Sequence, residues 1–232
     1  MAKGKRKAAS LPSQNHRLWL LKYEVDDERF QQIFGDFADL IRRSERACEK
    51  AAKQGNPEYA EAVSDTESDY LEELIGASFL VLQAKIRRVD KAAEHLVTFM
   101  KEQHGLTVKG LDHQSIFALG GKYRKSGHSR IELIWAIGNY YKHRDEWDAE
   151  VWKSRPAIAQ GHDPHRQSRR TRQTVEKAGI VQLSTGNMRR AYEFLGIKQY
   201  SKCEKLAEKV QAWAKEVYEH AKKECSRAQT GY

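Results

Sequence analysis

The feature that most constrains the fold of this chain is a long run of apolar residues at helical spacing. Between residues 64 and 104 an apolar side chain recurs every three or four positions, and no proline interrupts the run. This spacing places the apolar side chains on one face of an α-helix. Ser64 and Glu67 have the spacing of a capping box, and Gly105 follows the last turn. The sequence therefore predicts one very long helix over residues 64–104.

A glycine inside this run indicates a close contact with another helix. Gly76 lies among the apolar positions, where glycine costs about 1 kcal/mol of helix stability relative to alanine. A second helix that crosses close to the backbone would explain its presence.

The overall composition favours helices in the rest of the chain. Of 232 residues only four are proline, 40% are hydrophobic and 31% are charged, and the mean hydropathy is −0.79. These values are typical of helices with one buried and one solvated face. We therefore expect an all-α bundle of about six to eight helices, formed by residues 17–232 as a single domain behind a disordered basic arm, residues 1–16.

Two further amphipathic segments are expected to pack against the long helix. The first covers residues 17–54, begins its main helix after Asp26 and Asp27, and stops at Gly55–Pro57. Its apolar stripe comprises Phe30, Ile33, Phe34, Phe37, Leu40 and Ile41. The second covers residues 199–228, with a stripe of Leu206, Val210, Trp213, Val217 and Ala221.

The charge balance favours a polyanionic partner. The formal net charge is +9, which suits nucleic acid, although a basic tail on a solvated surface gives the same balance. Residues 153–174 contain prolines, glycines and many arginines, and they are expected to form a basic loop. This loop either contacts phosphates or is a solvated linker. Its candidate nucleic-acid-binding residues are Arg166, Arg169, Arg170 and Arg172.

Several classes of protein are disfavoured. The three cysteines are scattered without a CxxC pair, which disfavours a disulfide framework or zinc ribbon and fits a reducing cytoplasm. The longest apolar run, Leu74–Leu82, is too short to span a membrane, and the N-terminus lacks the apolar core of a signal peptide. Walker, GxGxxG, HExxH and GxSxG motifs are missing. We expect no cofactor, no bound metal and no membrane contact.

The strongest candidate site lies on a predicted helix from Ser129 to Trp147. Ser129 and Glu132 form a second capping box, so Glu132 has a structural role. Asn139 and His143 are four residues apart and share one face of an otherwise apolar helix. They form either a chemical site or hydrogen bonds inside the core, and the sequence leaves both readings open.

This segment resembles the motif of the HEPN (higher-eukaryote and prokaryote nucleotide-binding) domain. In that family an arginine is followed on one helix by a polar residue that is often asparagine, then by about three other residues, and then by a histidine. Residues 138–143, GNYYKH, place Asn139 and His143 at two of those positions, whereas Gly138 stands at the position of the arginine. The resemblance extends over residues 65–147 and includes Glu72, Gly76 and Gln83 on the long helix.

The resemblance implies an all-α protein that cuts RNA without a metal, often as a homodimer. A histidine near neutral pKa would act as acid or base on the ribose 2′-OH, and a guanidinium would stabilise the charge on phosphorus. His143 would be the acid–base group and Asn139 would orient it or the phosphate. Arg144 or Lys142 would have to replace the missing arginine. Without a replacement the chain would be a non-catalytic relative that binds RNA or a partner protein, such as an antitoxin or another complex subunit, in a stress, toxin or defence system.

Two other functions remain open. Short helices are predicted at residues 174–178 and 186–195 around Gly179, with Arg189 and Arg190 on the second helix. This pattern resembles a helix-turn-helix and would indicate a DNA-binding module. The third possibility is a helical scaffold subunit without enzymatic activity.

Overall fold

The computed structural model confirms an all-α bundle built around one very long helix. It describes residues 12–123, 126–147, 149–152, 166–182 and 184–230. Within these residues seven α-helices have eight or more residues. The helices are α1 (Pro12–Val25), α2 (Glu28–Ala52), α3 (Pro57–His104), α4 (His113–Leu119), α5 (Arg130–His143), α6 (Ala149–Trp152), α7 (Arg166–Glu176), α8 (Asn187–Phe194) and α9 (Glu204–Thr230). Two 3-10 turns, η1 (Arg144–Glu146) and η2 (Tyr200–Lys202), complete them.

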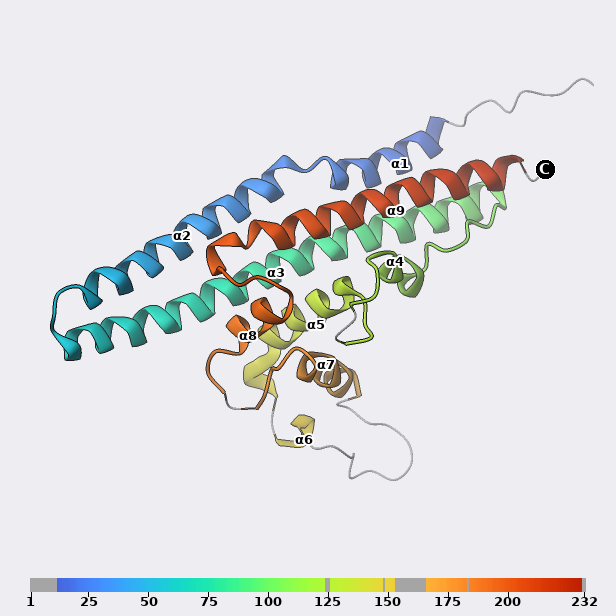
Figure 1. The fold of residues 1–232 in the computed structure, drawn as a ribbon. Helices are drawn as coiled ribbons and strands as arrows, with labels where there is room; N and C mark the ends of the chain where they lie inside the picture. Colours follow the sequence, from blue (N-terminus) through green and yellow to red (C-terminus); the bar gives the residue numbers. More distant parts are fainter. Residues whose placement is uncertain (1–11, 124–125, 148, 153–165, 183, 231–232) are drawn as a thin grey trace, which may run out of the picture.

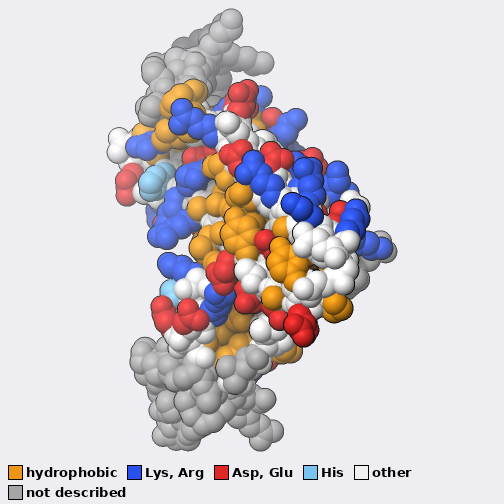
Figure 2. All heavy atoms as spheres, turned by 90° about the vertical axis from the view of Figure 1, so that its left-hand side faces the viewer, with side chains coloured by type: hydrophobic (Ala, Val, Ile, Leu, Met, Phe, Trp, Pro, Cys, Tyr) orange, Lys and Arg blue, Asp and Glu red, His pale blue; other side chains and the backbone are white. Residues whose placement is uncertain are grey.

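Helix α3 is the axis of the molecule. Helices α1, α2 and α9 run along it, and the shorter helices α4, α5, α7 and α8 gather on its other flank (Figure 1). The outer end of α1 and the end of α9 lie at the same end of the bundle, opposite the turn from α2 into α3 (Figure 1). At that turn, hydrophobic side chains form a band through the middle of the surface, with Lys and Arg interspersed among Asp and Glu (Figure 2).

The long helix starts seven residues earlier than its sequence pattern indicated. Asn56 caps the helix by accepting a hydrogen bond from the Tyr59 amide at 3.1 Å, and Pro57 occupies its first turn. Ser64 therefore lies inside the helix, and the predicted Ser64–Glu67 capping box is wrong. Glu67 instead accepts a 2.5 Å hydrogen bond from the Ser44 hydroxyl on α2. The predicted end at Gly105 is confirmed, with a left-handed φ of 64°.

The apolar stripe of α2 is confirmed except at one position. Phe30, Phe34 and Ile41 are buried, whereas Ile33 is 41% exposed. The predicted start is also confirmed, because the Asp27 carboxylate accepts from the Phe30 amide and caps α2. Ile33 is exposed because none of the described helices covers this side of α2.

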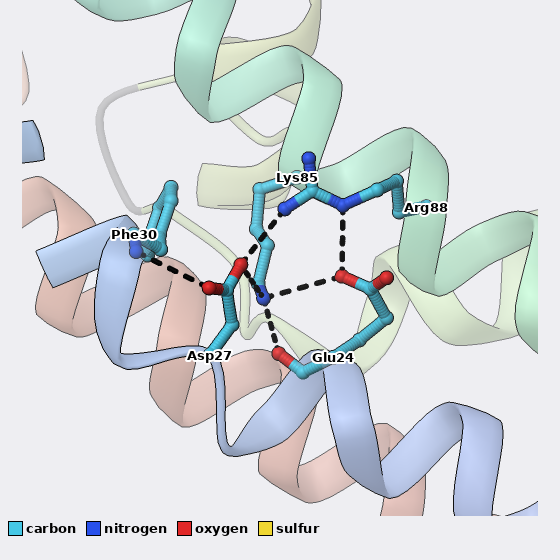
Figure 3. A network of polar contacts seen from close by, with 5 residues as sticks. All are labelled: Glu24, Asp27, Phe30, Lys85 and Arg88. Carbon is cyan, nitrogen blue, oxygen red and sulfur yellow. Dashed lines mark hydrogen bonds and ion pairs between the residues drawn. The ribbon is translucent and has the colours of Figure 1, made fainter.

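The junction between α1 and α2 is fixed to α3 by a charged network (Figure 3). The Lys85 side chain is fully buried, and its ammonium group donates to the Glu24 backbone carbonyl and to the Asp27 carboxylate, the latter at 3.1 Å. Arg88 donates to both carboxylates, at 2.9 Å to Glu24 and 3.0 Å to Asp27. A buried ammonium group is tolerated when it is paired and hydrogen-bonded, as it is here.

The last helix closes the bundle as its pattern predicted. All five residues of the predicted stripe on α9 are buried. The indole N–H of Trp213 donates to the Ile116 carbonyl of α4 at 2.7 Å, which anchors α9 on the short helices. None of the described helices is long and apolar enough to cross a membrane.

Three predicted boundaries differ from the structure. The helix of the candidate motif ends at His143 instead of Trp147, because the chain tightens into the 3-10 turn η1. Helix α7 begins at Arg166, so residues 166–174 are helical and not part of a loop. Helix α1 begins at Pro12, inside the expected disordered arm. The rest of the arm, residues 1–11, and the rest of the loop, residues 153–165, lie outside the described residues.

Candidate functional site

The candidate residues stand at the end of α5, which is held firmly in the bundle. Ser129 accepts from the Glu132 amide at 3.0 Å and Glu132 accepts from the Ser129 amide at 2.6 Å, which confirms the predicted capping box. Ile131, Leu133, Ile134 and Ile137 are buried. Their burial against α3 and α7 sets the orientation of the polar residues that follow.

The position of the motif arginine lies at a close crossing of α3 and α5. A Cβ atom on Gly138 would lie 3.0 Å from both the Phe79 carbonyl oxygen and the Gln83 Cβ. On the facing helix, a Cβ on Gly76 would lie 2.0 Å from the ring of Tyr141. The close contact predicted at Gly76 is therefore confirmed. Gly138 faces the α3 backbone, and an arginine there would require α3 to shift.

Asn139 bonds to the neighbouring helix. Its side-chain oxygen accepts a hydrogen bond of 2.5 Å from the Gln83 amide, and the same amide group lies 3.4 Å from the Trp135 carbonyl. Asn139 is half-buried. Of the two readings that the sequence left open, this contact matches the core hydrogen bond.

His143 and Lys142 reach the surface. The His143 side chain is 38% exposed, and its Nδ1 lies 3.0 Å from a carboxylate oxygen of Glu146. A carboxylate on one ring nitrogen fixes the orientation of the imidazole and favours the proton on that nitrogen. Within the described part of the chain, Nε2 of His143 has no hydrogen-bond partner. Lys142 is exposed beside it.

Arg144 is bound to α3 and is not available as a free cation. Its guanidinium donates to Glu73 at 2.6 Å and lies 4.6 Å from the centre of the Tyr141 ring. Burial opposes ionisation of Glu73, but hydrogen bonds from Tyr141 and Arg144 outweigh it and lower the pKa of the carboxyl. Burial, together with the Glu73 carboxylate, raises the pKa of Tyr141 to about 12. In this cluster the positive charge of Arg144 balances the negative charge of Glu73, and Tyr141 remains neutral.

A cavity of about 430 Å³ opens next to this cluster. It lies between α3, the start of η1 and the segment that leads into α8. Asp69, Glu72, Glu73 and Asp145 contribute negative charge, whereas Arg144 and Arg189 contribute positive charge. The lining is thus acidic overall, which disfavours a nucleic-acid phosphate in this cavity.

The amino end of α8 is already occupied by a carboxylate of the chain itself. Glu72 accepts from the Met188 amide at 2.6 Å and from the Arg189 amide at 3.3 Å. This contact satisfies the positive end of the helix, where a phosphate would otherwise bind. Arg190 donates to Ser184 at 2.7 Å.

Helix α8 packs on α3 through buried Met188. The Arg189 side chain lies 3.7 Å from Glu72 on α3, whereas Arg190 is exposed.

The arginines of α7 divide into buried and exposed ones. Arg169 is 8% exposed and Arg172 is 5% exposed. Arg172 donates to the Trp152 carbonyl at 2.5 Å and lies 3.6 Å from Glu176. Arg170 is exposed. The side chain of Arg166 lies outside what the structure describes. Of the four candidates, Arg170 is thus the described residue that a polyanion could reach.

Two contacts at the site escaped the sequence analysis. Glu146 stands three residues after His143, a helical spacing that could have indicated the pair. Glu73 lies on another helix, and no local pattern indicates its contact with Arg144.

Comparisons with protein families, curated proteins and solved structures find no match.

Among the described residues, no group of three His, Cys, Asp or Glu side chains could hold a metal ion. Cys48, Cys203 and Cys225 all lie in the described helices and turns, and no disulfide joins any two of them.

Proposed function

We propose that this chain is a HEPN-like, RNA-associated protein of the non-catalytic kind. The non-catalytic part of the proposal rests on the environment of Gly138, where a Cβ atom would lie only 3.0 Å from the Phe79 carbonyl oxygen, so that an arginine would require α3 to shift. Arg144, the nearest alternative, is bound by Glu73. Neither position 138 nor Arg144 thus offers a free guanidinium to stabilise charge on the phosphorus, and the remaining cation beside His143 is the ammonium group of Lys142, which lacks the planar fork of donors.

The association with RNA is supported by the motif resemblance, by the net charge of +9 and by the exposed cations near the end of α5. Lys142 and His143 are accessible at that end, and Arg170 is exposed on α7, which packs against α5. These side chains would contact phosphates, and a contact of this kind weakens as salt rises because bound counterions are released.

Binding to RNA is tested by fluorescence anisotropy over a range of salt concentrations. We expect the wild-type protein to bind single-stranded RNA, and the double variant Lys142→Ala/Arg170→Ala to lose about two units of the salt slope, since each phosphate contact contributes roughly one. Arg87→Ala is the matched control, because Arg87 is an exposed arginine on α3 that forms no ion pair with any described residue. Equal binding by all three proteins would contradict this contact surface, and no binding by the wild type would refute the RNA association.

Catalysis is tested separately with labelled RNA in the presence of EDTA. We expect no cleavage by the wild type or by His143→Ala. Cleavage by the wild type that disappears in His143→Ala would refute the non-catalytic proposal and establish a metal-independent ribonuclease. Duplex DNA serves as the competing ligand, and tighter binding to DNA than to RNA would favour a DNA-binding module instead.

A further inference from the structure

A second surface, away from the end of α5, is open and largely apolar. It is a groove of about 590 Å³ between α1, α2 and α3. Its apolar lining comprises Tyr23, Phe30, Ile33, Leu80, Val81 and Ala84. Tyr23 is 60% exposed and Ile33 is 41% exposed, although Ile33 belongs to the apolar stripe of α2. Large apolar side chains that remain exposed together indicate a contact surface.

The charged groups at one end of this groove are already paired. Glu24 and Asp27 bind Lys85 and Arg88, so their charges cancel within the chain (Figure 3). The network also links the junction of α1 and α2 to α3. Arg29 also lines the groove and is exposed, and it forms no ion pair with any residue that the structure describes.

A second unpaired charge of opposite sign lies on the same side of α2. Asp36 is exposed and, like Arg29, has no ion pair among the described residues. The two residues are seven positions apart, so they share one face and lie roughly 10 Å apart along the helix, two turns away from each other. They are too far apart to pair within one chain. Ile33 lies between them.

We propose that this face of α2 is a symmetric interface between two copies of the chain. If two α2 helices pack antiparallel about a two-fold axis between Gln32 and Ile33, Arg29 of each copy faces Asp36 of the other. A two-fold axis repeats every contact, so the Arg29–Asp36 ion pair would form twice between the two copies. One pair would lie on each side of the two Ile33 side chains. The exposed apolar groove then becomes buried between the copies.

The arrangement of charge favours a second copy over other occupants. A nucleic acid would be attracted by Arg29 and repelled by Asp36, and an acidic helix would be in the same position. A second copy is complementary to both charges at once. The proposal is independent of the proposed function, because the interface includes none of the residues at the end of α5.

The decisive experiment is a charge reversal, measured by sedimentation velocity at micromolar concentration. We expect the wild-type protein to be a dimer. Arg29→Asp alone and Asp36→Arg alone each place like charges together twice, and each should weaken dimerisation at least tenfold. The double variant Arg29→Asp/Asp36→Arg restores the pairing and should dimerise as the wild type does. Lys50→Asp, an exposed reversal far along α2, is the control and should remain dimeric.

A second measurement does not depend on affinity. Ile33→Cys should form a disulfide-linked dimer under mild oxidation, because the two Ile33 positions flank the axis, whereas Lys50→Cys should not. Circular dichroism checks that each variant keeps its helices. A monomeric wild type, or a dimer that ignores both single reversals, would overturn the proposal. A double variant that fails to regain the dimer would also overturn it.

Discussion

At the crossing of α3 and α5, two residues without a side chain bring the helices together. Gly138 lies against the Phe79 carbonyl, and Gly76 lies under the Tyr141 ring. In an exposed helix each glycine would cost about 1 kcal/mol relative to alanine. Here the close contact compensates for that loss, because any larger residue would push the helices apart. Gly138 thus has a packing role at this crossing.

Introducing the motif arginine should destabilise the protein and should not create an active site. We expect Gly138→Arg to lower the free energy of unfolding by about 3 kcal/mol, at the upper end of the range for overpacked sites. The matched control is Gly35→Arg in α2, where nothing lies within 4 Å of the position that a Cβ atom would take. That change should be neutral or stabilise the protein by up to about 1 kcal/mol.

Urea unfolding followed by circular dichroism measures both variants. If the Gly138→Arg protein is as stable as the wild type, an arginine side chain fits at position 138 between α3 and α5. The packing argument against catalysis would then be wrong.

At the scale of the helices, the junction of α1 and α2 should make the stability of the fold depend on pH, through the carboxyl group of Asp27. Burial alone would raise the pKa of Asp27, but the hydrogen bond from Lys85 and the charges of Lys85 and Arg88 outweigh it, so the pKa lies below its ordinary value. A carboxyl whose pKa is lowered in the folded state stabilises the protein above its unfolded pKa, about 3.9. That stabilisation is lost as the pH falls through the lower folded value.

Asp27→Asn isolates this contribution, because asparagine still caps a helix but carries no charge. We expect the variant to be less stable than the wild type at pH 7 and the difference to shrink as the pH falls below about 4. Asp26→Asn is the control, since Asp26 is exposed and forms a surface pair with Lys22 that contributes about 0–1 kcal/mol. Thermal unfolding between pH 3 and pH 7 measures the effect. A difference that is constant with pH would contradict the assignment.

At the scale of the whole molecule, Glu72 joins the long bundle to the smaller group of helices. Its carboxylate on α3 caps α8 through the amides of Met188 and Arg189. Tyr192 on α8 reaches back to Ser78 on α3 at 2.5 Å, so the same two helices meet twice. These contacts join residues that are more than a hundred positions apart in the sequence.

Removing the cap should loosen α8 from α3. We expect Glu72→Ala to lower the free energy of unfolding by about 1–2 kcal/mol, the usual range for the loss of a helix cap. Asp69→Ala changes an exposed acidic residue of the same cavity one turn earlier, and it should alter the stability by less than about 0.5 kcal/mol. Equal effects of the two substitutions in chemical unfolding would show that the cap does not stabilise the assembly.

The sequence by itself determined the class of fold, the main helices and the ends that carry strong local signals. The apolar stripe of α9, the Asp27 cap of α2 and the Ser129–Glu132 box of α5 are properties of neighbouring residues, so a local pattern is enough to predict them. The start of α3 was missed because Ser64 and Glu67 matched a capping box, while Asn56 and Pro57 provided the stronger start.

The tertiary structure decided the roles of the polar residues. Asn139 bonds to Gln83, Arg144 to Glu73, and Arg172 to the Trp152 carbonyl. In each case the partner lies far away in the chain or on another helix, and spacing along one helix says nothing about such a partner. The exposure of Ile33 has the same origin. Periodicity shows which side of α2 is apolar, but only the arrangement of the helices determines whether another helix covers it.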